Sequence, residues 1–232
     1  MVSERKNGHP AAAPRLWILD LDDTLYCASA GMFREIHRRM RGFISERLGL
    51  DEAAAAALQH RYWELYGTTF LGLVRHHGIA PQEFLSAAHD FDVRPYLVTC
   101  RGTRRLRAAV AALPGRKVVL TNGPGEYARR VLAGLHLQGL FDFVMSADEK
   151  LLGQWRSKPD AVMFAACAAR AGTNPRDAVL VEDSLRALKT AKRLGMKTVW
   201  CTGFRRAGRS PAAPPCWVDA AVANIEDMAG RM

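Results

Sequence analysis

The sequence LWILDLDDTLY, residues 16–26, joins a short apolar run to an abrupt acidic end. The run Leu16–Leu19 has the length and hydrophobicity of a buried strand in an α/β sheet. Side chains two residues apart in extended backbone point the same way, so we expect Asp20 and Asp22 to face one pocket. Two carboxylates about 4 Å apart repel each other by about 4 kcal/mol at an effective dielectric constant of about 20, and a cation or a shared proton would relieve that repulsion. These residues alone also suit a strand that ends in a solvated acidic turn.

Length, composition and charge are those of a globular protein. The 232 residues suit one large domain or a core with a subdomain, and 49% of them are hydrophobic and 24% charged. The formal net charge of +10 would suit an anionic partner, but the arginines are spread over the whole sequence. We therefore expect no stable nucleic-acid complex. We also expect the protein to be a monomer or a homodimer.

The cysteines and histidines indicate neither a zinc site nor a disulfide framework. The five cysteines form no CxxC pair, and such a scattered, odd set is typical of reduced thiols in a cytoplasmic protein. Cys100, beside Arg101, is expected to be a packing residue rather than a reactive thiolate. No apolar run approaches the length of a membrane span. The segment Met1–Arg15 lacks the apolar centre of a signal peptide and is expected to be a flexible tail.

Residues 28–94 have the pattern of a purely helical segment. Apolar residues recur at helical spacing, and aspartate, proline and glycine stand where helices commonly begin or end. We expect four helices: the first runs from Met32 to Leu48 and stops at Gly49, and the others begin near Asp51, Phe70 and Pro81. Because no strand pattern interrupts them, we expect an all-helical subdomain at 28–94, inserted into a core formed by 1–27 and 95–232.

From residue 95 onward, strand and helix patterns alternate. Short strands are expected at Lys117–Thr121, Phe141–Met145, Ala178–Glu182 and Lys197–Cys201, and a further short strand and helix near the end. Helices are expected from Thr103 onward and at Pro124–Ala133, Pro159–Ala171 and Ser184–Leu194. This alternation predicts an α/β fold with a Rossmann-like parallel sheet and helices on both faces, which binds ligands beyond the carboxyl ends of its strands. Neither a dinucleotide GxGxxG after a strand nor a GxxxxGK[ST] loop is present.

Polar side chains stand at the ends of three of the predicted strands. The first strand ends in Asp20 and Asp22, the second in Thr121 and Asn122, and the fourth in Glu182 and Asp183. Lys158 directly precedes the helix that leads into the fourth strand. Each residue alone has a structural explanation, such as a helix cap at Asp183 or a surface charge at Lys158. Their joint position at one edge of the sheet indicates a functional site.

The motifs that carry these residues, in the order DLDDT, LTNG, SKPD and VEDS, resemble the four motifs of the haloacid dehalogenase superfamily of phosphohydrolases. The resemblance runs from about Leu16 to Gly203, and the helical insert stands in the position of that superfamily's first cap. Within it, LDLDDTLY, YGTT, HDFD and VEDSLRALKTAKRLGM resemble the pyrimidine 5′-nucleotidase branch. The sequence departs from that branch at Lys150–Arg156, where KLLGQWR makes a bulkier and more basic approach to Lys158.

The resemblance implies a Mg²⁺-dependent phosphomonoester hydrolase that works through an aspartyl-phosphate. It implies that Asp20 is the nucleophile, that Asp22 is the general acid and base, and that Thr121, Asn122 and Lys158 bind the substrate phosphate. It implies metal ligands from the Asp20 and Asp183 carboxylates and the Asp22 backbone carbonyl, with Glu182 acting through water. Dehalogenases of the superfamily lack the second acid, so Asp22 disfavours carbon–halogen chemistry.

The substrate expectation rests on the helical insert. Tyr66, Thr68, Thr69 and His89 lie in segments that match the nucleotidase branch, and offer a nucleobase an aromatic face with polar partners. The alternative is that Tyr66 is a core residue and that the polar groups cap helices. A pyrimidine nucleoside 5′-monophosphate is the expected substrate, followed by a sugar phosphate or a phosphoglycolate-like acid. A basic nucleic-acid-binding protein with a vestigial site is the alternative from another functional class.

Overall fold

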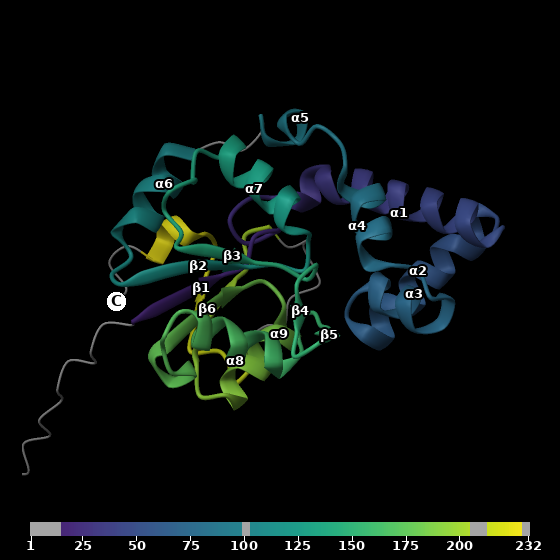
Figure 1. Ribbon diagram of the computed structural model, residues 1–232. Coiled ribbons are helices and arrows are strands. Elements are labelled where there is room, and N and C mark those ends of the chain that lie inside the picture. Colours follow the sequence, from purple (N-terminus) through teal and green to yellow (C-terminus); the bar gives the residue numbers. More distant parts are fainter. Residues whose placement is uncertain (1–14, 99–102, 205–212, 229–232) are drawn as a thin grey trace, which may run out of the picture.

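The computed structural model describes residues 15–98, 103–204 and 213–228. Figure 1 shows a central sheet with helices on both faces and a separate group of helices to one side. The sheet has six parallel strands in the order β3-β2-β1-β6-β7-β8. The strands are β1 (Leu16–Leu19), β2 (Arg116–Leu120), β3 (Phe143–Met145), β6 (Ala178–Glu182), β7 (Lys197–Cys201) and β8 (Ala220–Val222). The chain builds the sheet outward first on one side of β1 and then on the other, and open α/β sheets bind ligands at such a switch point.

Helices cover both faces of this sheet (Figure 1). One face carries α6 (Thr103–Ala112) and α7 (Gly125–Gly134), and the other carries α8 (Ala161–Arg170) and α9 (Leu185–Arg193). Alternate side chains of β1 point to opposite faces: Trp17 and Leu19 join one buried apolar cluster, and Leu16 and Ile18 join the other. Burial on both faces explains why this strand is continuously apolar. The predicted parallel sheet with helices on both faces is confirmed.

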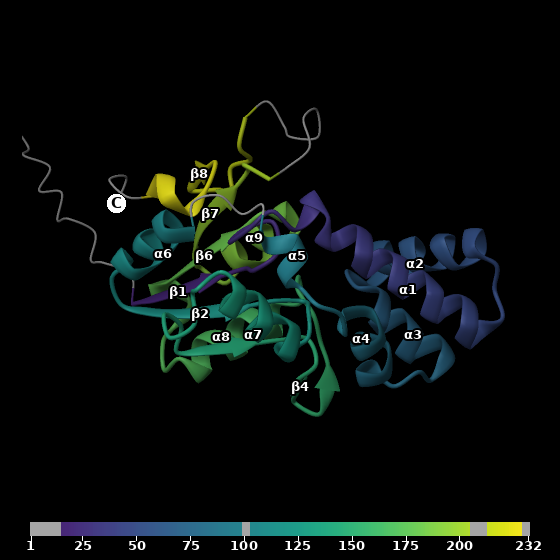
Figure 2. The ribbon, with the colours of Figure 1, turned by 90° about the horizontal axis from the view of Figure 1, so that it is seen from above.

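A second group of helices lies beside the sheet (Figures 1 and 2). It consists of α1 (Met32–Leu48), α2 (Glu52–Tyr66), α3 (Thr69–His77) and α4 (Pro81–His89). These helices share an apolar cluster of their own, which includes Ile44, Phe70 and Phe84. Gly72 lets α3 approach α2 closely, because a Cβ atom there would lie 2.2 Å from Cγ of Tyr62. The four helices lie where the sequence predicts them.

The ends of these helices follow the predicted chemistry. Gly49 ends α1 with φ of 66°, a left-handed conformation that costs glycine little. The Asp51 carboxylate accepts a hydrogen bond of 2.8 Å from the backbone N–H of Ala54 and so caps α2. Pro81 is the first residue of α4, where its missing N–H has no cost.

The basic segment before Lys158 forms a hairpin that the sequence did not indicate. Its strands are β4 (Lys150–Leu151) and β5 (Gln154–Trp155), which pair antiparallel. The two turn residues, Leu152 and Gly153, have φ of 52° and 75°. Positive φ at both positions suits a two-residue hairpin turn, but leucine is rarely found there. The usual Asn-Gly or Asp-Gly signal is therefore missing.

Other boundaries shift by a few residues. β3 begins at Phe143, two residues later than predicted, and α8 begins at Ala161 because the Asp160 carboxylate caps it by accepting a 2.9 Å hydrogen bond from Val162 N. A short helix, α5 (Arg94–Leu97), was not predicted.

The predicted tail lies outside the described residues except for Arg15, and so does Cys100. Within the described part of the chain, no helix combines the length and the apolar character that a membrane span requires.

Candidate active site

The carboxyl ends of the two central strands bring the predicted acids together. Asp20 directly follows β1, and its backbone N–H donates to the carbonyl of Val181 in β6 at 3.0 Å. This backbone bond extends the β1–β6 pairing and sets Asp20 beside Glu182, the last residue of β6. Both acids are buried, with 5% and 2% of their surfaces exposed. The switch point of the sheet therefore carries a buried pair of carboxylates.

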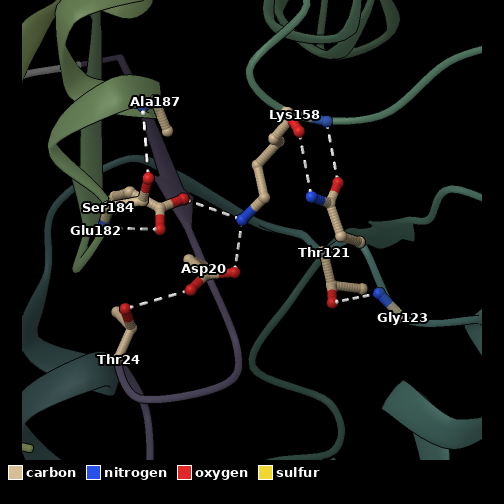
Figure 3. A network of polar contacts seen from close by, with 9 residues as sticks. Asp20, Thr24, Thr121, Gly123, Lys158, Glu182, Ser184 and Ala187 are labelled. Carbon is tan, nitrogen blue, oxygen red and sulfur yellow. Dashed lines mark hydrogen bonds and ion pairs between the residues drawn. The ribbon is translucent and has the colours of Figure 1, made fainter. Parts of the chain in front are cut away.

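Lys158 lies between these two carboxylates (Figure 3). Its Nζ donates to Oδ1 of Asp20 and, at 2.8 Å, to Oε2 of Glu182. The hydroxyl of Thr24 donates to the other oxygen of Asp20, Oδ2, at 3.2 Å. Lys158 is itself buried, and an ammonium group can be buried in this way because carboxylates pair with it.

Asn122 holds the backbone of Lys158 in place. Its Nδ2 donates to the Lys158 carbonyl at 3.0 Å, and its Oδ1 accepts from the Lys158 N–H at 2.8 Å. The substrate contact expected of Asn122 stays a prediction, since the structure shows its amide engaged in anchoring Lys158. Thr121 is buried beside it, and its Oγ1 accepts from the N–H of Gly123 at 2.9 Å (Figure 3). The Thr121 hydroxyl donates to no other group among the described residues, so its proton can be offered to a ligand.

Asp22 lies two residues beyond Asp20 and has different neighbours. Its Oδ1 accepts hydrogen bonds from the hydroxyls of Tyr26 and Tyr127, at 2.5 and 2.6 Å. Burial raises the pKa of Asp22, and the hydrogen bonds from Tyr127 and Tyr26 oppose that rise. Neither tyrosine was predicted from the sequence as part of the site. Tyr26 stands four residues after Asp22, which was a usable signal, whereas Tyr127 has the pattern of an ordinary buried helix residue.

Burial dominates the acid–base properties of the acidic cluster. Burial and the Glu182 carboxylate raise the pKa of Asp20 to about 8 and that of Asp183 to about 10, while Lys158 lowers both. Burial lowers the pKa of Lys158, but the facing carboxylates of Asp20 and Glu182 outweigh it and raise that pKa overall. Lys158 pairs with Asp20 and Glu182, and Asp183 is the third acid of the cluster. A divalent cation bound there would favour the ionised form of these acids and so oppose the rise in their pKa values.

The acidic cluster has the donor set of a divalent metal site. Carboxylate oxygens of Asp20, Glu182 and Asp183 lie within 4.8 Å of one another. Such hard oxygen donors suit Mg²⁺. The indole Nε1 of Trp200 donates to the carbonyl of Asp183 at 3.0 Å and fixes the backbone of that residue. The carboxylates expected to be ligands are therefore grouped together, and the ligand role of the Asp22 carbonyl stays a prediction.

A pocket of about 660 Å³ lies between the strand ends and the helical group. Its wall from the sheet side includes Asp20, Asp22, Thr121, Lys158 and Asp183. Its wall from the helical side includes Phe33, Arg41, Gln59, Trp63, Thr68, Thr69 and His89. A volume in this range suits a small-molecule ligand. The first four residues of the helical wall were not predicted, because the helical pattern did not separate a pocket face from a core face.

The four predicted substrate contacts of the insert do not all lie in this wall. Thr68, Thr69 and His89 line the pocket, but Tyr66 is not among the lining residues. The Tyr66 hydroxyl lies 2.6 Å from Nε2 of His76, so its contacts agree with the alternative that it packs within the helical group. Burial lowers the pKa of His89 to about 4, so its ring is neutral near pH 7. Nδ1 of His89 donates to a backbone carbonyl at 2.9 Å, which makes its Nε2 a hydrogen-bond acceptor.

Sequence comparisons relate the chain to hydrolases. A sequence model of haloacid dehalogenase-like hydrolases matches residues 14–195. The chain is similar to Phosphate metabolism protein 8 of Saccharomyces cerevisiae, with 23% identity over 205 residues that cover 84% of this chain and 64% of that protein. It is also similar to Validoxylamine A 7′-phosphate phosphatase of Streptomyces hygroscopicus subsp. limoneus, with 28% identity over 110 residues, 47% of this chain and 48% of that protein. The chain therefore spans less than two thirds of the length of these curated relatives.

A structural comparison agrees with the fold. The crystal structure of CbbY from Rhodobacter sphaeroides in complex with phosphate matches 93% of this chain and 96% of its own, with a TM-score of 0.61 and 18% identity. At this identity the likeness concerns the fold of the sheet and helices.

Proposed function

The chain belongs to the haloacid dehalogenase-like hydrolase family, and from that premise we propose that it is a Mg²⁺-dependent phosphomonoester hydrolase that works through an aspartyl-phosphate on Asp20. The observation that carries the proposal is the pair Asp20 and Asp22. The first carboxylate contacts a buried lysine, and the second lies two residues away with a separate set of partners. Two acids in different environments suit one nucleophile and one proton donor.

In the first step, an oxygen of Asp20 forms a bond to phosphorus while the bond from phosphorus to the ester oxygen breaks. Asp22 gives its proton to the departing oxygen, and Lys158 and the Thr121 hydroxyl hold the phosphoryl oxygens. In the second step, water attacks phosphorus, Asp22 takes a proton from it, and the Asp20 carboxylate is released. Bound by the Asp20 and Asp183 carboxylates and the Asp22 carbonyl, with Glu182 acting through water, Mg²⁺ would supply positive charge that lets an anionic phosphate approach a carboxylate.

We also propose that residues 28–94 act as a cap. The pocket wall comes partly from the strand ends and partly from α1, α2, α3 and α4, which supports a substrate held between the strand ends and the helical group. A leaving group placed there is shielded from water, and a cap excludes large phosphorylated partners. The cap therefore favours small phosphomonoesters.

Within that class, a nucleoside 5′-monophosphate with a pyrimidine base is our first choice. The resemblance of the insert to the nucleotidase branch carries this choice, and the pocket wall supports it. Phe33 and Trp63 offer aromatic surface, and Gln59, Thr68 and Thr69 offer polar groups. The relative from Streptomyces is named for another phosphate ester, validoxylamine A 7′-phosphate. A small phosphate ester other than a nucleotide, such as a sugar phosphate or a phosphoglycolate-like acid, is therefore the second candidate.

A substrate panel tests this choice. At saturating Mg²⁺, we expect kcat/KM for UMP, CMP or dUMP to exceed that for AMP, GMP and several sugar phosphates by about tenfold, or about 1.4 kcal/mol in transition-state binding. A sugar phosphate or a short phospho-acid that exceeds every nucleotide tenfold would contradict the nucleotidase assignment and leave the phosphatase assignment standing.

Replacing Asp183 with asparagine is expected to raise the Mg²⁺ concentration for half-maximal activity by roughly 10- to 100-fold, because it removes one negative charge from the metal-binding cluster. Asp177→Asn is the matched control, since Asp177 is exposed and precedes β6 at its other end. Metal titrations of phosphate release compare the two variants. Equal titration curves for Asp183→Asn and the wild type would remove Asp183 from the set of ligands.

A further inference from the structure

One carboxylate oxygen of Asp22 and two tyrosine hydroxyls contact one another at the edge of the active site. Oδ1 of Asp22 lies 2.5 Å from the Tyr26 hydroxyl and 2.6 Å from the Tyr127 hydroxyl, and the two hydroxyls lie 2.6 Å apart. Tyr26 ends the loop that follows β1, and Tyr127 belongs to α7. Two segments more than 100 residues apart in sequence thus converge on one carboxylate oxygen.

Both tyrosines are set in apolar surroundings. Tyr26 and Tyr127 are 2% and 0% exposed, and their rings belong to the same buried cluster as Trp17 and Leu19. A buried phenol requires a hydrogen-bond partner, and here each hydroxyl has Asp22 and the other tyrosine. The rings are held by packing, so the positions of the two hydroxyls are fixed independently of Asp22.

The two hydroxyls are interchangeable as donors to Asp22. Two phenols carry two protons, so two of the three short contacts are hydrogen bonds at any moment when the carboxylate is ionised. In every such arrangement at least one proton points to Oδ1. Removing one hydroxyl leaves the other in direct contact with Oδ1, and removing both leaves Oδ1 without either donor.

The second oxygen of Asp22 is in a different position. Oδ2 makes no hydrogen bond to any residue in the described part of the chain, while Asp22 itself lines the pocket. A carboxylate held through one oxygen can rotate little, so the other oxygen keeps its orientation. A proton donor needs this, because its oxygen has to be within hydrogen-bond reach of the departing ester oxygen.

We propose that Tyr26 and Tyr127 are positioning residues that hold Asp22 through Oδ1 and so direct Oδ2 toward the leaving group. This inference rests on the proposed phosphatase function and deepens it. The tyrosines do not touch the reacting atoms; they act through Asp22. Their contribution is therefore confined to the part of the reaction that needs a proton.

The test compares a nucleotide or other alkyl phosphate with p-nitrophenyl phosphate, whose leaving group departs without much help from an acid. For the double variant Tyr26→Phe/Tyr127→Phe, we expect kcat/KM on the alkyl phosphate to fall about 100-fold, as a misplaced catalytic group commonly causes. For p-nitrophenyl phosphate, we expect a change of less than about threefold. Each single variant is expected to lose only a few-fold on the alkyl phosphate, because one donor remains.

A mutant cycle then asks whether the tyrosines act through Asp22. In the Asp22→Asn background, the two Tyr→Phe changes should cause no further loss, because the group that they position is no longer an acid. Tyr62→Phe is the matched control: Tyr62 is a buried tyrosine of the helical group whose hydroxyl contacts His77 at 2.8 Å, away from Asp22. Thermal unfolding of each variant checks the fold, and phenylalanine suits the apolar cluster that holds both rings.

The outcomes separate this inference from the proposed function. An equal loss on both esters, or the same loss with and without Asp22, would overturn the positioning role while the phosphatase assignment stands. Wild-type protein that hydrolyses neither ester in Mg²⁺ would overturn the proposed function and this inference together.

Discussion

Asp20→Asn protein is expected to lose its phosphatase activity by a factor of at least about 10⁴, because the change removes the nucleophile and keeps the volume of the side chain. The amide oxygen of asparagine can still accept from Lys158, and the amide nitrogen can still contact Thr24. Lys158 also keeps its 2.8 Å contact with Glu182. We therefore expect the fold to persist.

Hydrolysis of p-nitrophenyl phosphate in saturating Mg²⁺ measures this loss, and thermal unfolding measures the stability. The midpoint of unfolding should move by no more than about 4 °C, which corresponds to about 1 kcal/mol for a chain of this size. Asp177→Asn, an exposed change at the opposite end of β6, should retain wild-type activity. Asp20→Asn protein that is folded and hydrolyses the aryl ester at nearly the wild-type rate would exclude Asp20 as the nucleophile.

The second large effect is expected for Asp22→Asn, and it should depend on the substrate. General acid catalysis contributes about 10²- to 10⁴-fold, so kcat/KM for a nucleotide or another alkyl phosphate should fall by that factor. An aryl leaving group needs less protonation, and its kcat/KM should fall by less than about tenfold. The parameter kcat/KM is suitable because it reports the steps up to the departure of the leaving group.

A series of phosphate esters with leaving groups of decreasing acidity makes the comparison quantitative. The loss caused by Asp22→Asn should increase steadily as the leaving group becomes a weaker acid. Equal losses across the series would mean that Asp22 does not protonate the leaving group, and its role would then be one of charge or metal binding alone.

The fold was predictable because its signals are local. β1 is buried on both faces, so its side chains form a continuous apolar run, and the alternation of strands with helices implies the parallel sheet. The helices of the insert have standard ends, such as the left-handed Gly49 and the capping Asp51. The hairpin around Leu152 was not predictable in this way, since Gly153 suits the second turn position but the first is a leucine, which rarely adopts positive φ.

The strand-end part of the site was predictable for a topological reason. Parallel strands end at one edge of a sheet, so residues after β1 and β6 are brought together whatever lies between them in the sequence. Asp20, Glu182 and Asp183 are grouped there, and Lys158 joins them from the loop before α8. The side chains meet at distances that only the folded structure gives.

The rest of the site depends on how packed elements face one another. Tyr127 reaches Asp22 because of the position of α7 on the sheet, which no periodicity in the sequence records. Tyr66 and Trp63 both lie on α2, but of these two residues Trp63 lines the pocket and Tyr66 does not. Which side of a cap helix faces the pocket is decided by its contacts with the other helices, and an amphipathic pattern shows only that two sides differ.

The central claim is that a phosphoryl group passes through Asp20. It is tested most directly by acid-quenching Asp22→Asn protein during turnover of p-nitrophenyl phosphate and mapping the phosphoryl group by mass spectrometry. In this variant the aryl group departs without the acid, but the hydrolysis of the intermediate lacks its base, so the intermediate should accumulate. We predict a burst of p-nitrophenol equal to the enzyme concentration and a single phosphoryl group on the peptide that contains Asp20. Release of p-nitrophenol with no phosphoryl group on Asp20, or with the group on another side chain, would contradict the account.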